Sequence, residues 1–168
     1  DGYFDYPAIE KALEDKTIKL ATIQRSKGYQ TRPSYSVEKI GELIAFIKER
    51  RPDVICMVDN CYGEFVERIE PSDVGADMIV GSLIKNPGGG LAPIGGYVAG
   101  RADLIENCAY RLTSPGLGKE VGATLGVTTV LLSGILPCTN CCMRCFKGCY
   151  FCSKYLRSFR ISGNSERF

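Results

Sequence analysis

Short, continuously apolar runs are the feature that most constrains the fold of this chain. Residues 54–58 read VICMV and residues 78–80 read MIV, and each run is bounded by polar or glycine residues. Runs of this length are typical of strands that are buried on both faces of a parallel sheet. Residues 18–23 and 96–100 predict two further strands.

Amphipathic segments alternate with these strands. Asp5 and Pro7 predict a helix start, and Ser36 can cap a helix with apolar residues at 37, 40, 43, 44 and 47. Residues 101–112 predict another helix, and 114–126 read as a glycine-punctuated loop entering the next. The alternation predicts an α/β fold with three layers, in which helices cover a mostly parallel sheet.

Composition divides the chain into two parts near Pro137. Residues 138–168 carry 6 basic and 1 acidic groups and six of the nine cysteines, whereas residues 1–137 carry 15 basic and 18 acidic groups. We therefore treat 1–137 as one domain and 138–168 as a basic, Cys-rich tail. The chain has no histidine, which excludes catalytic triads and zinc sites that use that residue.

The sequence also bears on location and partners. It lacks an apolar run long enough to span a membrane, and its acidic start is unlike a secretory signal. Many free thiols suit a reducing cytoplasm. We expect a cytoplasmic protein without a membrane or nucleic-acid partner. Because the chain begins with Asp, we also expect a fragment.

Three polar side chains follow the buried strands. Asp59 ends the first run, and Ser82 and Lys85 follow the second. Ligands of open α/β sheets bind beyond the carboxyl ends of the strands. A carboxylate, a hydroxyl and an amine together suit pyridoxal 5'-phosphate, which has a basic ring nitrogen, a phosphate and an aldehyde.

The spacing of these residues also allows an ordinary structural reading. Asp59 can cap a turn, and Lys85 can be an exposed loop residue. The glycines at 88–90 suit either a mobile turn or a close approach of backbone to a ligand or a subunit. The segment 116–122, GLGKEVG, lacks the spacing of a phosphate-binding loop, and we read it as a loop and helix start.

Four stretches resemble the methionine gamma-lyase family, whose members are also described as aluminium resistance proteins. They are IQRSKGY (23–29), VDNCYGEFVE (58–67), GADMIVGSLIKNPGGG (75–90) and APIGGYVAG (92–100). The resemblance covers roughly residues 1–135. It implies part of the large domain of a fold-type I pyridoxal-phosphate enzyme, a lyase that breaks carbon–sulfur bonds in sulfur-containing amino acids.

The resemblance also implies roles for individual residues. Lys85 would be the Schiff-base lysine and proton carrier, Asp59 would pair with the pyridine nitrogen, and Ser82 would contact the phosphate. Arg25 and Ser26 would line the cofactor site. The substrate would be a small molecule, an amino acid, the full-length parent would be a homo-oligomer, and this fragment alone would be inactive.

The tail leaves several interpretations open. Its cysteines, at 138, 141, 142, 145, 149 and 152, recur with helical spacing and can form a small buried stripe. They can also bind zinc through thiolates, or an iron–sulfur cluster through 145, 149 and 152. A reading-frame change near residue 137 would equally explain the shift in composition. The alternative function is therefore a Cys-rich metal-binding or interaction protein.

Overall fold

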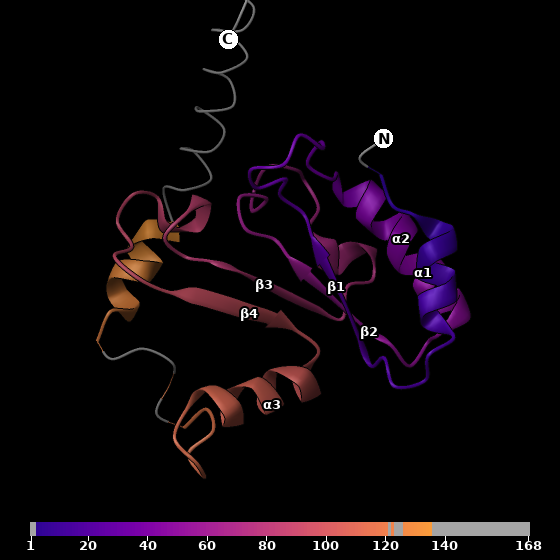
Figure 1. Ribbon diagram of the computed structural model, residues 1–168. Helices are drawn as coiled ribbons and strands as arrows, with labels where there is room; N and C mark the ends of the chain where they lie inside the picture. The colour runs from indigo at the N-terminus through magenta and orange to yellow at the C-terminus, as the bar shows by residue number, and fades with distance from the viewer. Residues whose placement is uncertain (1–2, 121, 123–125, 136–168) are drawn as a thin grey trace, which may run out of the picture.

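The computed structural model describes residues 3–120, 122 and 126–135. These residues form an α/β fold around a four-stranded sheet, with the strands in the order β1-β2-β3-β4 (Figure 1). The strands are β1 (Leu20–Gln24), β2 (Ile55–Asp59), β3 (Met78–Ser82) and β4 (Gly96–Gly100). The first three are parallel, and β4 is antiparallel to β3. The predicted α/β fold and mostly parallel sheet are therefore confirmed.

The helices begin where the sequence predicts. They are α1 (Tyr6–Leu13), α2 (Val37–Arg50) and α3 (Ala102–Leu112), with two short 3-10 helices, η1 (Pro71–Val74) and η2 (Asn86–Gly88). The side chain of Asp5 accepts a hydrogen bond from the Ala8 N–H, and that of Ser36 accepts one from the Lys39 N–H. Both predicted N-caps are thus confirmed. Residues 128–135 are also helical.

The hydrophobic core lies between α1, α2 and one face of β1 and β2. All five apolar positions predicted for α2 are buried, and they are Val37, Ile40, Leu43, Ile44 and Ile47. They pack with Leu13 of α1, Ile23 of β1 and Cys56 and Val58 of β2. Figure 1 shows α1 and α2 side by side next to these two strands. This core fixes the strands whose carboxyl ends carry the candidate site.

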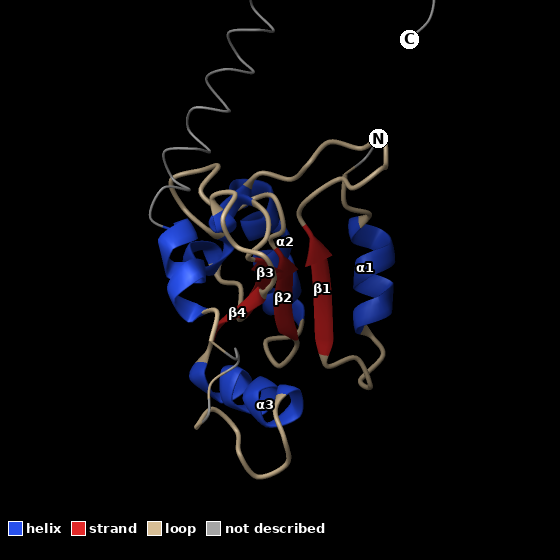
Figure 2. Ribbon diagram, turned by 90° about the vertical axis from the view of Figure 1, so that its left-hand side faces the viewer, coloured by secondary structure: helices blue, strands red, loops and turns tan. Residues whose placement is uncertain are grey.

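The opposite face of the sheet is only partly covered by the described residues. Ile55 and Met57 are half-buried, and Leu20 is 43% exposed. Helix α3 packs against β4 (Figure 2), and its Cys108 thiol lies 3.8 Å from the sulfur of Met78. The prediction that residues 54–58 are buried on both faces is therefore wrong for the described part of the chain, because α3 covers the β3–β4 side and not β1.

The strands also extend further toward their carboxyl ends than the apolar runs do. β2 includes Asp59 and β3 includes Ser82, because backbone pairing continues beyond the last apolar side chain. Asp59 pairs with Val80, and Ser82 pairs with Gly96. Among the described residues, no helix is long and apolar enough to cross a membrane.

Candidate functional site

Asp59 and Ser82 project from the same face of the sheet. Asp59 is opposite Val80 in the parallel register, and side chains alternate between faces along a strand. Ser82 stands two residues after Val80, so its side chain points to the same side as that of Asp59. The predicted carboxylate and hydroxyl therefore come together at the carboxyl ends of β2 and β3.

Lys85 lies in the turn that follows β3, close to the segment that follows β2. Its ammonium nitrogen is 5.0 Å from the centroid of the Tyr62 ring, which is within the range of a cation–π contact. Ile84, which precedes Lys85, is 54% exposed, because the turn after β3 directs it outward. The ring of Tyr62 is therefore the apolar group beside the amine.

Cys61 links the carboxylate and the amine electrostatically. Its backbone N–H donates to Oδ1 of Asp59 at 3.1 Å. Burial first and the Asp59 carboxylate second raise the pKa of the Cys61 thiol to about 11, while the charge of Lys85 acts in the opposite direction. Asp59, Cys61 and Lys85 thus form one interacting cluster.

Arg25 lies at the end of β1 and is 4% exposed. Its Nη1 donates to Oδ1 of Asn60 at 2.7 Å and to the Gly63 carbonyl at 3.0 Å, and its Nη2 is 2.5 Å from Oε1 of Glu67. Glu67 also accepts the N–H of Val37, the first residue of α2. The guanidinium therefore joins the end of β1 to the loop that follows Asp59.

A cavity of about 260 Å³ lies beside this network. Arg25 and Ser26, both predicted to line a cofactor site, contribute to its wall. The other lining residues are Ser34, Tyr35, Ser36, Cys61, Tyr62, Gly63, Val66 and Glu67. Ser26 is half-buried, and its carbonyl accepts a hydrogen bond from Arg32 at 2.7 Å. Contact of Arg25 and Ser26 with a cofactor stays a prediction.

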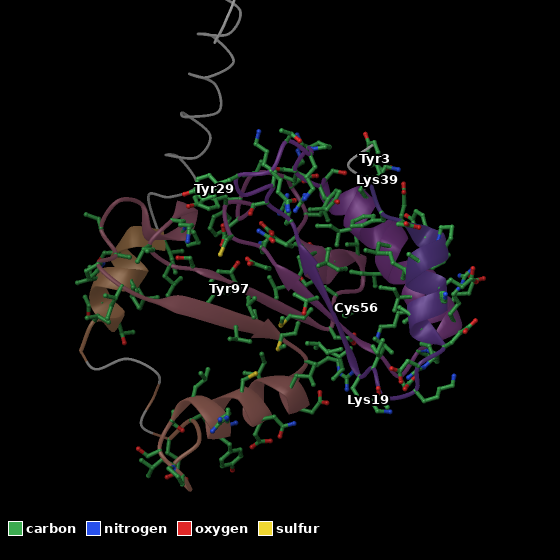
Figure 3. The ribbon with its side chains drawn as sticks, viewed as in Figure 1. Tyr3, Lys19, Tyr29, Lys39, Cys56 and Tyr97 are labelled. Atoms are coloured by element: carbon green, nitrogen blue, oxygen red, sulfur yellow. The ribbon has the colours of Figure 1, made fainter. Side chains whose placement is uncertain are left out.

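A second polar group, which the sequence did not predict, lies on the other face of the sheet. The Tyr97 hydroxyl donates to Oε1 of Glu64 at 3.1 Å, and Asn60 lies 3.4 Å from the same hydroxyl. Figure 3 shows Tyr97 on β4. Glu64 is 3% exposed, and its Oε2 has no hydrogen-bond partner among the described residues. Burial raises the pKa of Glu64 and also that of Tyr97.

The sequence held only weak signals for these residues. Asn60 follows Asp59 directly, and strand alternation sends its side chain to the face opposite that of Asp59. Glu64 and Tyr97 are 33 positions apart. Their contact depends on the course of the loop after β2, and no local periodicity predicts that course.

Comparison with known proteins identifies the family. The sequence pattern of the methionine gamma-lyase family matches residues 1–167. The chain belongs to this family. Members of the methionine gamma-lyase family are pyridoxal-phosphate-dependent enzymes. The match includes most of the Cys-rich segment, so the family resemblance continues beyond the shift in composition at Pro137.

Individual relatives agree with this membership. Protein YnbB of Bacillus subtilis is 48% identical over 166 residues, which cover 99% of this chain and 39% of YnbB. A Listeria monocytogenes structure is assigned as a cystathionine beta-lyase involved in aluminium resistance, and it matches with a TM-score of 0.87 and 50% sequence identity. The match covers 94% of this chain and 38% of the Listeria chain. A carbon–sulfur lyase involved in aluminium resistance from Clostridium novyi NT matches with a TM-score of 0.84 and 47% sequence identity. The match covers 94% of this chain and 37% of the Clostridium chain.

These comparisons also set the scale of the chain. It spans about two fifths of the length of the relatives that it matches. The predicted tail at 138–168, with its alternatives of a buried stripe, zinc or iron–sulfur, lies outside the described residues. Within the described residues, no group of three or more His, Cys, Asp or Glu side chains could hold a metal ion.

Proposed function

We propose that this chain supplies part of a pyridoxal-phosphate site in a lyase that breaks carbon–sulfur bonds of sulfur-containing amino acids. The observation that carries the proposal is the meeting of Asp59 and Ser82 on one sheet face, with Lys85 on the next turn. The chain's membership in the methionine gamma-lyase family supports it. So does the Clostridium novyi relative, which bears the name of a carbon–sulfur lyase.

The fold fits the large domain of a fold-type I enzyme. Helices α1 and α2 cover one face of the sheet, and α3 lies against β4. We propose that these layers are part of the three-layer arrangement of such a domain. The free thiols of Cys56, Cys61 and Cys108 are consistent with a reducing cytoplasm.

The donor set of the described residues fits the cofactor. A carboxylate stands at the end of β2, a hydroxyl at the end of β3 and a primary amine three residues later. Lys85 has no salt-bridge partner, and the Ser82 hydroxyl makes no hydrogen bond, within the described part of the chain. Both groups are thus available to an incoming ligand.

Each residue then has a distinct role. The bound cofactor would supply an electron-withdrawing ring. Asp59 would keep the pyridine nitrogen protonated, Ser82 would donate to the phosphate, and Lys85 would bind the aldehyde carbon. Once released, the Lys85 amine would accept the proton from the α carbon of the substrate. Ser26 would line the site at the end of β1, and Arg25, whose guanidinium lies on the other face of the sheet, would hold the loop after Asp59 in place.

We also propose that a second copy of the full-length protein packs near this site. Several large apolar side chains in the loops after β2 and β3 are exposed, and they are Tyr62, Phe65, Val66, Ile69, Ile84, Leu91 and Ile94. Exposed apolar groups in one region are typical of an interface.

Borohydride trapping tests the proposal. The chain is incubated with pyridoxal 5'-phosphate, reduced with borohydride and digested, and the labelled lysine is identified by mass spectrometry. We expect preferential labelling of Lys85 and its loss in Lys85→Ala, with the exposed Lys11 of α1 as the reference for ordinary surface lysines. The same experiment with Asp59→Asn should show weaker labelling, since the ring nitrogen loses its carboxylate partner.

Two outcomes would count against the proposal. One is labelling spread evenly over the surface lysines. The other is stoichiometric zinc or iron in the purified chain that disappears when Cys149 and Cys152 are replaced. The second outcome would favour the Cys-rich metal-binding protein.

A further inference from the structure

Two side chains satisfy three consecutive carbonyl groups in the loop after β2. The Asn86 side-chain amide donates to the carbonyls of Tyr62, at 3.1 Å, and Glu64, at 3.2 Å. Arg25 donates to the intervening carbonyl of Gly63 at 3.0 Å. The loop is therefore held from β1 on one side and from the turn after β3 on the other.

The conformation of this loop explains why it needs such support. Tyr62 has φ 68° and Phe65 has φ 61°, and side chains of this size rarely adopt the left-handed region. A residue in that region persists only when its surroundings hold it there. At Gly63 an added Cβ would clash with the Arg25 guanidinium, so the loop follows the arginine closely.

The turn that carries Asn86 is itself firmly placed. Pro87 and Gly88 of η2 are buried. A Cβ at Gly88 would overlap the carbonyl of Leu83, and one at Gly134 would overlap the carbonyl of Gly88. The turn is thus packed against the helix at 128–135, and Asn86 acts from a fixed position.

We propose that Asn86 is a positioning residue that fastens the loop after Asp59 to the turn that carries Lys85. Lys85 precedes Asn86, and the Tyr62 ring beside its ammonium belongs to the residue whose carbonyl Asn86 binds. Through these contacts Asn86 sets the distance between the amine and the Asp59–Cys61 pair. The inference deepens the proposed function, because these are the groups assigned to the cofactor.

A reagent unrelated to the cofactor tests this role. o-Phthalaldehyde joins a thiol and a neighbouring primary amine in a fluorescent isoindole, with loss of two water molecules. The Lys85 ammonium nitrogen lies 5.0 Å from the ring centroid of Tyr62, the residue that follows Cys61, so we expect this product at the Cys61–Lys85 pair. Peptide mapping assigns it, and Cys61→Ser, which removes the thiol, should abolish it.

Asn86→Ala should reduce the rate of this product about fivefold or more, since it removes two hydrogen bonds and the loss of one of ordinary strength shifts a positional equilibrium by that factor. Asn107→Ala, on the exposed side of α3, is the matched control and should leave the rate unchanged. Alkylation of Cys61 alone is measured in parallel, so that a change in thiol reactivity is separated from a change in distance. Asn86→Leu, which is uncharged and close to the side chain in shape but has no donors, should behave like Asn86→Ala.

A wild-type rate in a folded Asn86→Ala chain would overturn the inference. If circular dichroism shows that both Asn86 variants are unfolded, Asn86 supports the fold as a whole and the inference is also overturned. Failure of the chain to bind pyridoxal phosphate would count against the proposed function without changing either result, because the isoindole forms without the cofactor.

Discussion

Nη1 of Arg25 lies 2.7 Å from Oδ1 of Asn60, and the two residues are only 4% and 2% exposed. This contact anchors the carboxyl ends of β1 and β2 on the face covered by α2. Asp59 precedes Asn60 and therefore points to the opposite face, toward Ser82 and Lys85. A buried polar contact on one face of the sheet thus fixes the direction of the candidate cofactor carboxylate on the other.

Replacement of Arg25 should destabilise the chain strongly. Arg25→Lys keeps the charge, but an ammonium cannot serve Asn60, Gly63 and Glu67 at once. We expect the free energy of unfolding to fall by about 2 kcal/mol or more, since buried acceptors lose their donors. Urea denaturation followed by circular dichroism measures this change.

The control is Arg68→Lys, the same substitution at an exposed arginine in the loop after β2, which Arg25 contacts. It should leave the unfolding midpoint almost unchanged. Equal midpoints for the two variants would show that the Arg25 network contributes little to stability.

The positions of some site residues could be predicted from the sequence and those of others could not, and this difference has a physical cause. The common sheet face of Asp59 and Ser82 was predictable, because the ends of parallel strands meet at one edge of a sheet. The burial of Arg25 also follows from alternation, since it lies two residues after the buried Ile23. These inferences need only the strand positions.

Contacts made by the loops were not predictable in this way. Asn86 binds carbonyls 22 and 24 positions away, and Tyr62 adopts a backbone conformation that its residue type disfavours. Such features depend on tertiary hydrogen bonds, which leave no periodic pattern in the sequence. The same reason explains why the exposure of Ile84 was not predicted.

Glu64 should make stability depend on pH. Burial raises its pKa above 4.5 in the folded chain, against opposing hydrogen bonds from Tyr97 and the Ser82 backbone. A group with a raised folded pKa stabilises most below its unfolded pKa, and this contribution is lost as pH rises through the folded value. Glu64→Gln removes the ionisation, so wild type should lose stability relative to this variant as pH increases above 4.5.

Urea unfolding of wild type and Glu64→Gln at several pH values checks this expectation. Tyr97→Phe removes the donor to Oε1 and should steepen the loss in wild type, since the ionised carboxylate then lacks that partner. A difference between wild type and Glu64→Gln that stays constant with pH would contradict the prediction.

Asp77 should give the opposite pH dependence. Burial acts to raise its pKa, but hydrogen bonds from Lys48, the Cys56 N–H and Arg101 outweigh burial and hold the pKa below 3.8. The stabilising contribution is therefore present above pH 3.8 and is lost as pH falls through the lower folded value. Asp77→Asn should be less stable than wild type at neutral pH, and the difference should shrink in acid.

Thermal unfolding of both proteins at neutral and acidic pH measures the difference in stability, and a larger difference in acid would contradict the assignment.

Cys61 should be an unreactive thiol whose reactivity reports on Asp59. With its pKa raised to about 11, by burial first and by Asp59 second, little thiolate is present at neutral pH. Relative to an unperturbed cysteine thiol, with a pKa of 9.0, this predicts alkylation by iodoacetamide that is slower by about a hundredfold.

Asp59→Asn removes the negative charge beside the Cys61 thiol and should speed the alkylation, whereas Asp73→Asn in η1 serves as the remote control. Mass spectrometry of the Cys61 peptide over a range of pH gives the rates. A Cys61 rate that is the same in wild type and Asp59→Asn would show that the thiol and the carboxylate do not interact, and it would separate Cys61 from the cluster around Lys85.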